Sequence, residues 1–408
     1  MSIPPPAVRR RTVAAMATLV GLGLGPAAGS ASVGPASSGE TQVVLPTSLD
    51  APEGREATLE SDPTGPAAMA LTYGTTTEVE TSVDPLVLAA ADDVYRRVRT
   101  AERRKTSSDL GSPAPMMLST DGRTVAVGSS RDDGTVALVD TSSGEIDEVG
   151  LDRVNATLPS AWDPDNGYLW VRARYVYEAQ RSGDTVYDDW EWHRIDLSRQ
   201  RAERLPPLDR ALNVAPLHGT GQLLVRHNSG RAQIFSVDDL QPVSDSFDLS
   251  GVVEGWASAP HGNRFAVTGT DELRVHDAAD PERVVDTVGI PEGSRFQGWV
   301  DDSSVLIGWA DEGAGRWALE EVDLDSGRRV LVTEQPAVRS GAQIGGVTLA
   351  TGLLSELDTR EPGRSDHGHL WSRLGPWPVL VVGALLGGAL ILVLRRRRSR
   401  PGGDERLG

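Results

Sequence analysis

The sequence predicts an all-β protein built from repeated four-stranded units and followed by a single apolar helix near its C-terminus. Two observations predict the sheets. A turn that leads into an apolar strand recurs about every 40–55 residues, and each copy is followed by a strand that ends in an acidic turn. A third observation, an uncharged segment followed directly by arginines, predicts the helix.

The N-terminus has the three parts of a signal peptide. Three arginines at 9–11 are followed by an apolar run over 12–24, and small residues around Ala31 fit a cleavage site. The apolar run is shorter than the about 20 residues that a membrane-spanning helix needs. Residues 1–31 are therefore predicted to be a cleaved signal peptide, with an uncleaved N-terminal anchor as the alternative.

The C-terminal segment predicts a single membrane span. Residues 377–394 carry no charge, and as a helix they extend about 27 Å, close to the thickness of the hydrocarbon layer. Arginines follow at once, so the positive-inside rule places the basic tail, 395–408, in the cytoplasm and everything before it outside the cell membrane. Residues 358–376 are predicted to form a polar stalk.

Two glycines inside the predicted transmembrane helix have the spacing of a helix-packing motif. Gly383 and Gly387 form G-x-x-x-G, which lets two membrane helices approach closely. The alternative is a pair of small residues with no packing partner.

Composition narrows the class of partner. The 408 residues carry a net charge of −18 although both termini are basic, so the segment between them is strongly acidic and repels nucleic acid. The absence of cysteine excludes thiol catalysis, zinc–thiolate sites and lipid attachment through cysteine. Lysine occurs once, at Lys105, against many arginines, which is typical of a high-GC bacterium such as an actinobacterium.

Residues 32–65 precede the repeats and are rich in Ser, Pro, Gly, Thr and Glu. A segment with so few large apolar side chains buries too little surface to offset its ordering entropy, so it is predicted to be a flexible linker. The ectodomain is predicted to occupy residues 66–357.

Each repeat begins with a turn of Gly, Asp, Asn or Pro, residues that favour tight hairpins because they tolerate or preset the backbone angles of a turn. The strands that follow these turns are 124–128, 168–171, 222–225, 264–267 and 304–307. The acidic turns that end the later strands lie at Asp140, Asp196, Asp238, Asp277 and Asp323, at intervals of 56, 42, 39 and 46 residues.

Such a unit is four short antiparallel strands that cannot bury both faces alone, so copies must stack. Radial stacking of four-stranded blades gives a β-propeller, here with about six blades and seven as the alternative. Residues 337–354 are expected to supply the first strands of the last blade. Residues 86–106 would supply its outer strands and close the ring.

The turns also carry a family resemblance. The Trp-x-Pro-Asp-x-Gly turn at 162–167 and the Asp-x-x-Ser-Gly turns at 140–144 and 323–327 resemble those of TolB-like and WD-repeat propellers, over roughly residues 90–355. The Trp-Asp and Gly-His pairs of true WD repeats are not at their expected positions, which favours the TolB-like group. The resemblance implies the architecture and not a ligand.

The main irregularity of the repeats is the connection between Val171 and Asp196, about ten residues longer than its counterparts. The resemblance to propellers implies that it lies on the ligand-binding face. Exposed aromatic side chains beside carboxylates can stack on sugars or anchor a protein, although in a long hairpin they can also pack on one another. The candidate binding residues are Tyr175, Tyr177, Tyr187, Asp188, Asp189, Trp190 and Trp192.

No local catalytic or metal-binding motif is present, and no cofactor is predicted. The acidic pairs at 132–133, 188–189 and 301–302 are adjacent in sequence, so their side chains point to opposite faces of a strand. The turn at 163–167 lacks the distal glutamate of a calcium loop. No zinc spacing of histidines, G-x-S-x-G elbow or phosphate loop occurs.

These features predict a membrane-tethered, extracytoplasmic propeller that binds a protein or an envelope component as a scaffold. Because propeller enzymes assemble sites from scattered residues, one alternative is a hydrolase or lyase acting on a glycan or lactone at the central channel. Another is an accessory subunit of a membrane complex, recruited through Gly383 and Gly387.

Overall fold

The computed structural model describes residues 44–49, 52, 56–76, 81–91, 93–104, 113–130, 133–178, 185–187, 189–249, 256–258, 263–311, 315–336 and 343–360. Within these ranges, no helix is both long and apolar enough to cross a membrane. The predicted signal peptide, transmembrane helix and basic tail, with Gly383 and Gly387, lie outside the described residues, as does nearly all of the predicted stalk.

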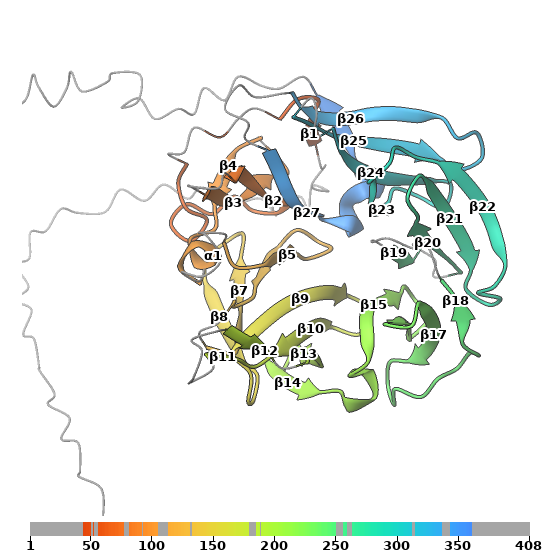
Figure 1. Ribbon diagram of the computed structural model, residues 1–408. Helices are drawn as coiled ribbons and strands as arrows, with labels where there is room; N and C mark the ends of the chain where they lie inside the picture. Colours follow the sequence, from red (N-terminus) through yellow and green to blue (C-terminus); the bar gives the residue numbers. More distant parts are fainter. Residues whose placement is uncertain are drawn as a thin grey trace, which may run out of the picture. The chain divides into compact units, whose positions relative to one another are not determined.

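Six four-stranded antiparallel sheets surround a common centre, so the chain is a six-bladed β-propeller and the seven-bladed alternative is wrong (Figure 1). Blade 1 is β5 (Met116–Leu118), β6 (Thr124–Val127), β7 (Thr135–Asp140) and β8 (Ile146–Gly150). Blade 2 is β9 (Ala156–Asp163), β10 (Tyr168–Arg174), β13 (Glu191–Asp196) and β14 (Arg201–Arg204). Blade 3 is β15 (Ala211–Leu217), β16 (Gln222–His227), β17 (Arg231–Ser236) and β18 (Phe247–Asp248).

The remaining blades complete the ring. Blade 4 is β19 (Trp256–Ser258), β20 (Arg264–Thr268), β21 (Glu272–Asp277) and β22 (Val284–Gly289). Blade 5 is β23 (Arg295–Trp299), β24 (Ser304–Asp311), β25 (Arg316–Asp323) and β26 (Arg329–Gln335). The closing blade is β27 (Gln343–Leu349), β2 (Ala67–Thr76), β3 (Thr81–Ala89) and β4 (Tyr95–Arg97).

The acidic turns form the hairpins between the two outer strands of their blades, as predicted. The Asp140 carboxylate accepts hydrogen bonds from the backbone N–H groups of Ser142 (2.8 Å) and Ser143 (2.7 Å), and Gly144 follows with φ of 73°. Asp323 accepts in the same way from Ser326 (2.7 Å). A side-chain acceptor followed by a residue that tolerates positive φ is what a tight turn requires, which explains why this pattern repeats with the blades.

The ring closes by joining the two ends of the propeller sequence. β27 pairs with β2 in an antiparallel ladder that runs from Met69↔Leu349 to Gly74↔Gln343. The predicted closure is thus confirmed in outline. The division of the closing blade between the two ends of the sequence differs from the prediction. The C-terminal part supplies one strand, the innermost, and the N-terminal part supplies the other three, beginning at Ala67.

The described residues of 44–65, here called the N-terminal strap, are packed against the ring, which differs from the flexible linker predicted for this part of 32–65. β1 (Val44–Pro46) pairs in parallel with β28 (Asp358–Arg360). The Leu49 N–H donates to the carbonyl of Glu334 in blade 5 at 2.7 Å. Leu45 and Leu49 are both 1 % exposed, in a core cluster shared by the closing blade and blade 5.

The strap continues along the other edge of the closing blade. Leu59 is fully buried, and its N–H donates to the Arg97 carbonyl in β4 at 2.9 Å. The Glu60 carboxylate accepts from the N–H (2.7 Å) and hydroxyl (2.8 Å) of Thr100, in the first turn of α1 (Arg99–Arg103). A few well-placed leucines therefore anchor a segment whose average composition indicates disorder.

Candidate binding surfaces

An alternating row of arginine and aromatic side chains occupies one face of blade 2. The β10–β13 register places Trp170 opposite Arg194 and Arg172 opposite Trp192. Residues directly opposite in an antiparallel pair share a face, and diagonal neighbours lie within reach of long side chains. We call the row Tyr168, Trp170, Arg172, Arg174, Trp190, Trp192 and Arg194 the arginine–aromatic ladder.

Contacts along the ladder are cation–π interactions. The Arg194 guanidinium lies 4.9 Å from the centre of the Tyr168 ring. At the other end, the guanidinium groups of Arg172 and Arg174 lie 4.8 Å and 4.3 Å from the centre of the Trp190 indole. Two cations therefore share one aromatic ring, which attracts each of them through its quadrupole.

The middle of the ladder belongs to the core between blades 2 and 3. Trp170 and Trp192 are fully buried in a cluster that includes Leu223 and Val225 of β16. The Trp192 indole N–H donates to the Ala211 carbonyl of blade 3 at 2.9 Å. Blade 3 covers the centre, so a ligand can reach only the two ends of the ladder: the end of Tyr168 and Arg194, which lines a pocket, and the end of Trp190.

Beyond that end, the chain extends as a further hairpin. β11 (Val176–Glu178) and β12 (Thr185–Tyr187) form a separate two-stranded sheet that prolongs the connection between β10 and β13 (Figure 1). Tyr175 lies at its base and is 45 % exposed. An exposed aromatic side chain thus lies where β10 passes into the hairpin.

The structure separates the candidate residues into different roles. Tyr175 and Asp189 are exposed and Trp190 is half-buried, so these three fit a binding surface. Trp192 is fully buried and holds blade 2 on blade 3, so its side chain belongs to the core. The backbones of Tyr177 and Tyr187 pair within β11 and β12, while Asp188 lies outside the described residues.

The arginines of this surface were missed by the sequence analysis, which considered aromatic and acidic residues alone. The signal was available, because Arg172 and Arg174 alternate in β10, while Trp190 and Trp192 alternate just before and within the partner strand β13. Burial lowers the pKa of the Arg172 guanidinium, and the positive charge of Arg174 lowers it further. The site thus brings two guanidinium groups onto one aromatic ring in a chain whose net charge is −18.

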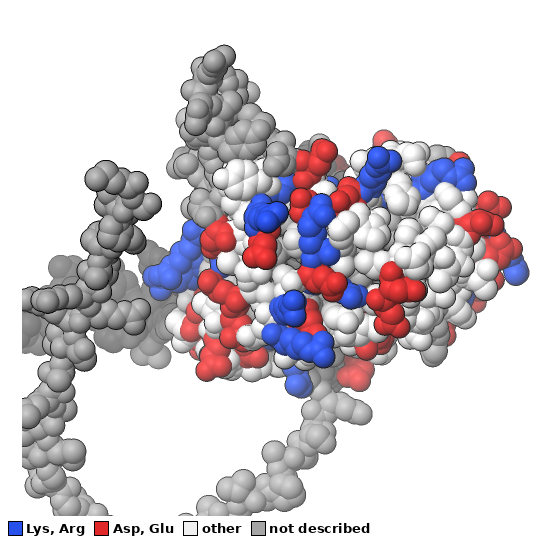
Figure 2. Space-filling view, turned by 90° about the horizontal axis from the view of Figure 1, so that it is seen from below, with Lys and Arg blue, Asp and Glu red and all other residues white. Residues whose placement is uncertain are grey.

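The outer edge of blade 2 is different, because its arginines already form ion pairs with carboxylates. Arg204 binds Glu191 at 2.7 Å and Asp209 at 2.8 Å. Arg194 binds Glu203 at 3.0 Å, although it also belongs to the ladder. On the side of the ring shown in Figure 2, basic and acidic side chains are interspersed. Charges that neutralise each other locally offer little to an ionic partner.

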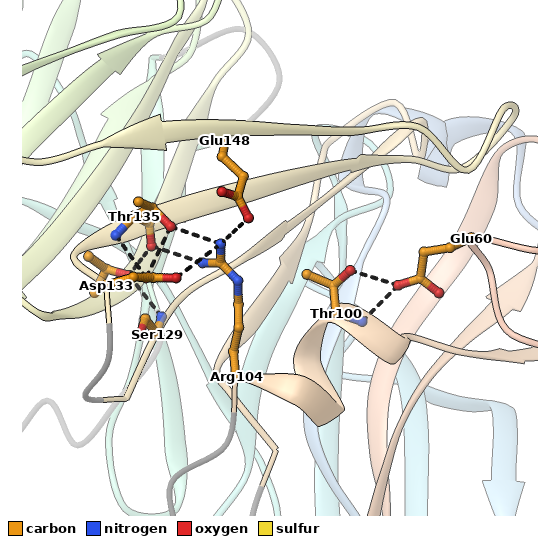
Figure 3. A network of polar contacts seen from close by, with 8 residues as sticks. Glu60, Thr100, Arg104, Ser129, Asp133, Thr135 and Glu148 are labelled. Carbon is orange, nitrogen blue, oxygen red and sulfur yellow. Dashed lines mark hydrogen bonds and ion pairs between the residues drawn. The ribbon is translucent and has the colours of Figure 1, made fainter. Parts of the chain in front are cut away.

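A buried arginine at the junction of the closing blade and blade 1 is likewise fully engaged (Figure 3). Arg104 is 8 % exposed, and its Nη2 donates to Glu148 at 2.7 Å and to the Thr135 hydroxyl at 2.8 Å. Its Nη1 donates to the Thr135 carbonyl at 3.1 Å, and Asp133 lies 3.5 Å from Nη2. This network joins two blades and leaves no charge for a ligand.

A second concave surface lies at the centre of the ring. A pocket of about 600 Å³ is lined by the innermost strands and by the turns that follow them. The aromatic and large apolar side chains in its wall include Met117, Trp162, Val214, Phe296, Trp299 and Val347. Such a volume and lining are typical of sites for small molecules.

The ionisable side chains in the lining of this pocket are Asp165 and His218. His218 Nδ1 contacts Asp165 Oδ2, which also accepts the Gly219 N–H at 2.7 Å. The Trp162 indole N–H is shielded from solvent and has no acceptor among the described residues. Within the same residues, no group of three or more His, Cys, Asp or Glu side chains could hold a metal ion.

Comparisons with known proteins bear on the fold alone. No protein-family model and no curated protein matches the sequence. Among solved structures, a chain of a nidogen/laminin complex is 9 % identical, with a TM-score of 0.45 over 70 % of this chain and 99 % of that one. The Cps50 (Swd1) β-propeller domain of Myceliophteria thermophila is 16 % identical, with a TM-score of 0.38 over 55 % of this chain and 71 % of that one.

A chain of a mitotic checkpoint complex is also 16 % identical, with a TM-score of 0.43 over 78 % of this chain and 92 % of that one. Identities and scores this low carry no information on a ligand or a partner. The propeller predicted from the repeats is confirmed by the six sheets themselves. The TolB-like assignment stays a prediction.

Proposed function

We propose that this protein is a membrane-tethered binding module whose propeller docks a protein partner through the free end of the arginine–aromatic ladder. The observation that carries the proposal is the contact of Arg172 and Arg174 with the half-buried Trp190, together with the exposed Tyr175, which follows Arg174 in sequence. Tyrosine, tryptophan and arginine are the residues most enriched at the energetic centres of protein interfaces.

The scaffold supports this use of the surface. Trp192 and Trp170 are locked in the core between two blades, so the ladder end is held by rigid strands below it. A surface that is already ordered loses little conformational entropy when a partner binds. The β11–β12 hairpin adds a projecting edge that a flat propeller face lacks.

The location is part of the same proposal. The signal-peptide pattern of 1–31 and the uncharged segment 377–394 followed by arginines support an extracytoplasmic propeller on one transmembrane helix. We place the protein in the cell membrane of an actinobacterium and the propeller in the TolB-like group, on the composition and turn patterns alone. Packing through Gly383 and Gly387 would make it an accessory subunit of a membrane complex.

A second candidate function uses the central pocket. The contact between Asp165 and His218 supplies the acid–base pair that a hydrolase or lyase acting on a small glycan or lactone would need. The apolar wall equally suits a bound ligand that undergoes no reaction. The ladder is preferred for the main function because it concentrates interface-type side chains on a projecting edge.

The test is a comparison of partner capture by the full-length protein from membranes of the native organism. Wild type is compared with Tyr175→Ala and Trp190→Ala, and Val243→Ala serves as a control because Val243 is an exposed apolar residue on blade 3. We expect one captured protein to be lost from both ladder variants and kept by the control, with melting temperatures close to wild type. Equal capture by all four proteins would remove blade 2 from the proposal, and a partner displaced by a small pocket ligand would favour the second function.

A further inference from the structure

Most of the half-buried and buried arginines in the described part of this chain are neutralised by carboxylates. Removing a guanidinium from water is costly unless an anion and hydrogen-bond acceptors replace the water. The arginines that obey this rule with an ion pair are Arg96, Arg97, Arg104, Arg194, Arg264, Arg274 and Arg316.

Arg172 departs from the rule. Its guanidinium contacts the indoles of Trp190 and Trp192, at 4.8 Å and 5.9 Å, and no aspartate or glutamate among the described residues forms an ion pair with it. Its Nε is shielded from solvent and has no acceptor there. Burial and the neighbouring charge of Arg174 lower the pKa of Arg172, which agrees with a cation that lacks an anion.

The chemistry of the guanidinium determines what Arg172 can still bind. A guanidinium is planar and presents its N–H donors as a rigid fork in that plane. Trp190 and Trp192 supply ring faces and no carboxylate oxygen, so Arg172 still lacks a bidentate acceptor among the described residues. A carboxylate matches that fork in shape and supplies the missing charge.

We infer that the partner presents a carboxylate to Arg172, beside Arg174, so that one aspartate or glutamate of a protein segment completes the arginine–aromatic ladder. This inference rests on the proposed function, because it names the chemistry of the partner at the same surface. Tyr175, the neighbour of Arg174 in sequence, is exposed and offers a separate apolar contact, so the partner segment carries an apolar or aromatic side chain near its aspartate or glutamate.

Charge favours a protein carboxylate over a polyanion. The chain has a net charge of −18, so it repels a densely charged polymer at long range. A single carboxylate on an otherwise neutral segment avoids that repulsion and still gains the contact with Arg172. The test must therefore distinguish binding of a protein carboxylate from binding of an acidic polymer.

The test is a selection of displayed random peptides on the full-length protein in detergent micelles, with wild type and four variants. Arg172→Gln removes the charge, and Arg172→Lys keeps the charge but removes the planar fork. Trp190→Ala removes the stacking surface, and Arg123→Gln is the control because Arg123 is an exposed arginine in a turn of blade 1. The best peptide is then synthesised with its acidic residue intact and with that residue replaced by its amide.

We expect wild type and the control to enrich peptides that pair an acidic residue with an apolar one. Arg172→Gln, Arg172→Lys and the amide peptide should each lose affinity by at least about tenfold. Peptides that need Trp190 but carry no acidic residue would overturn the inference and leave the proposed function standing. Peptides whose binding depends on neither Arg172 nor Trp190 would overturn both the inference and the proposed function. Tight binding of inorganic polyphosphate that depends on Arg172 would overturn the choice of a protein carboxylate.

Discussion

The N-terminal strap makes a quantitative prediction, because its leucines are buried in a segment whose composition predicts a flexible linker. Leu45 is 1 % exposed and contributes to the core shared by the closing blade and blade 5. Replacing a buried leucine by alanine costs about 2.7–5.0 kcal/mol, since it removes apolar contact and leaves a cavity. Taking about 3 kcal/mol, and about 2 °C per kcal/mol for a domain of this size, Leu45→Ala should lower the melting temperature by about 6 °C.

The assay is thermal unfolding of the full-length protein followed by circular dichroism in the β-sheet region. The matched control is Leu212→Ala, the same substitution at a leucine that is 38 % exposed on β15, which should cost under about 1 kcal/mol. Melting of Leu45→Ala together with wild type would refute the packing of the strap. A fall in melting temperature no larger than that of Leu212→Ala would also refute it.

Three further predictions concern turns, core and pH. Gly122→Ala should lower the free energy of unfolding by more than about 3 kcal/mol, because a Cβ there would lie 2.2 Å from the Ala67 carbonyl oxygen. Gly167→Ala, at the equivalent turn of blade 2, meets no atom within 4 Å and should cost only about 1–2 kcal/mol for the positive φ. Unfolding in urea measures both values. Trp192→Ala should cost about 3–5 kcal/mol in the same assay and Trp190→Ala far less, since only the first is fully buried. Burial lowers the pKa of His193 and His276 in the folded protein, so below about pH 6.5 the unfolded chain binds more protons than the folded chain. The free energy of unfolding should therefore fall as the pH drops below about 6.5, by at most about 1.4 kcal/mol per pH unit for each histidine. His276→Gln should flatten this dependence, and an unchanged slope would count against a neutral buried imidazole.

The blades could be predicted from the sequence because a turn needs particular residues at particular places. Asp140 and Asp323 each accept backbone N–H groups in a hairpin, and a glycine with positive φ follows each of them. Such local requirements leave a pattern that repeats along the chain, so the strand order and the closure of the ring could be anticipated.

The strap could not be predicted because its stability comes from contacts distant in sequence. Leu49 donates to Glu334, and Leu59 to Arg97, so each depends on surface that other blades provide. Average composition does not detect two or three leucines that meet a complementary core.

The arginine–aromatic ladder was predicted only in part, because its remaining features also depend on contacts distant in sequence. The long connection and its aromatic residues are visible in the sequence, but whether Trp190 or Trp192 faces solvent depends on where blade 3 lies. The role of Arg172 follows only when the β10–β13 register is known, because register decides which side chains stack.

The central claim is that a protein partner docks on the free end of the ladder, and crosslinking at Tyr175 tests it most directly. A photoreactive phenylalanine replaces Tyr175 in the full-length protein, and in a control protein it replaces Val330, an exposed residue of β26 in blade 5. The account predicts one discrete crosslinked product in native membranes from position 175, absent from position 330 and reduced by Arg172→Gln. No product from position 175, or the same product from both positions, would contradict it.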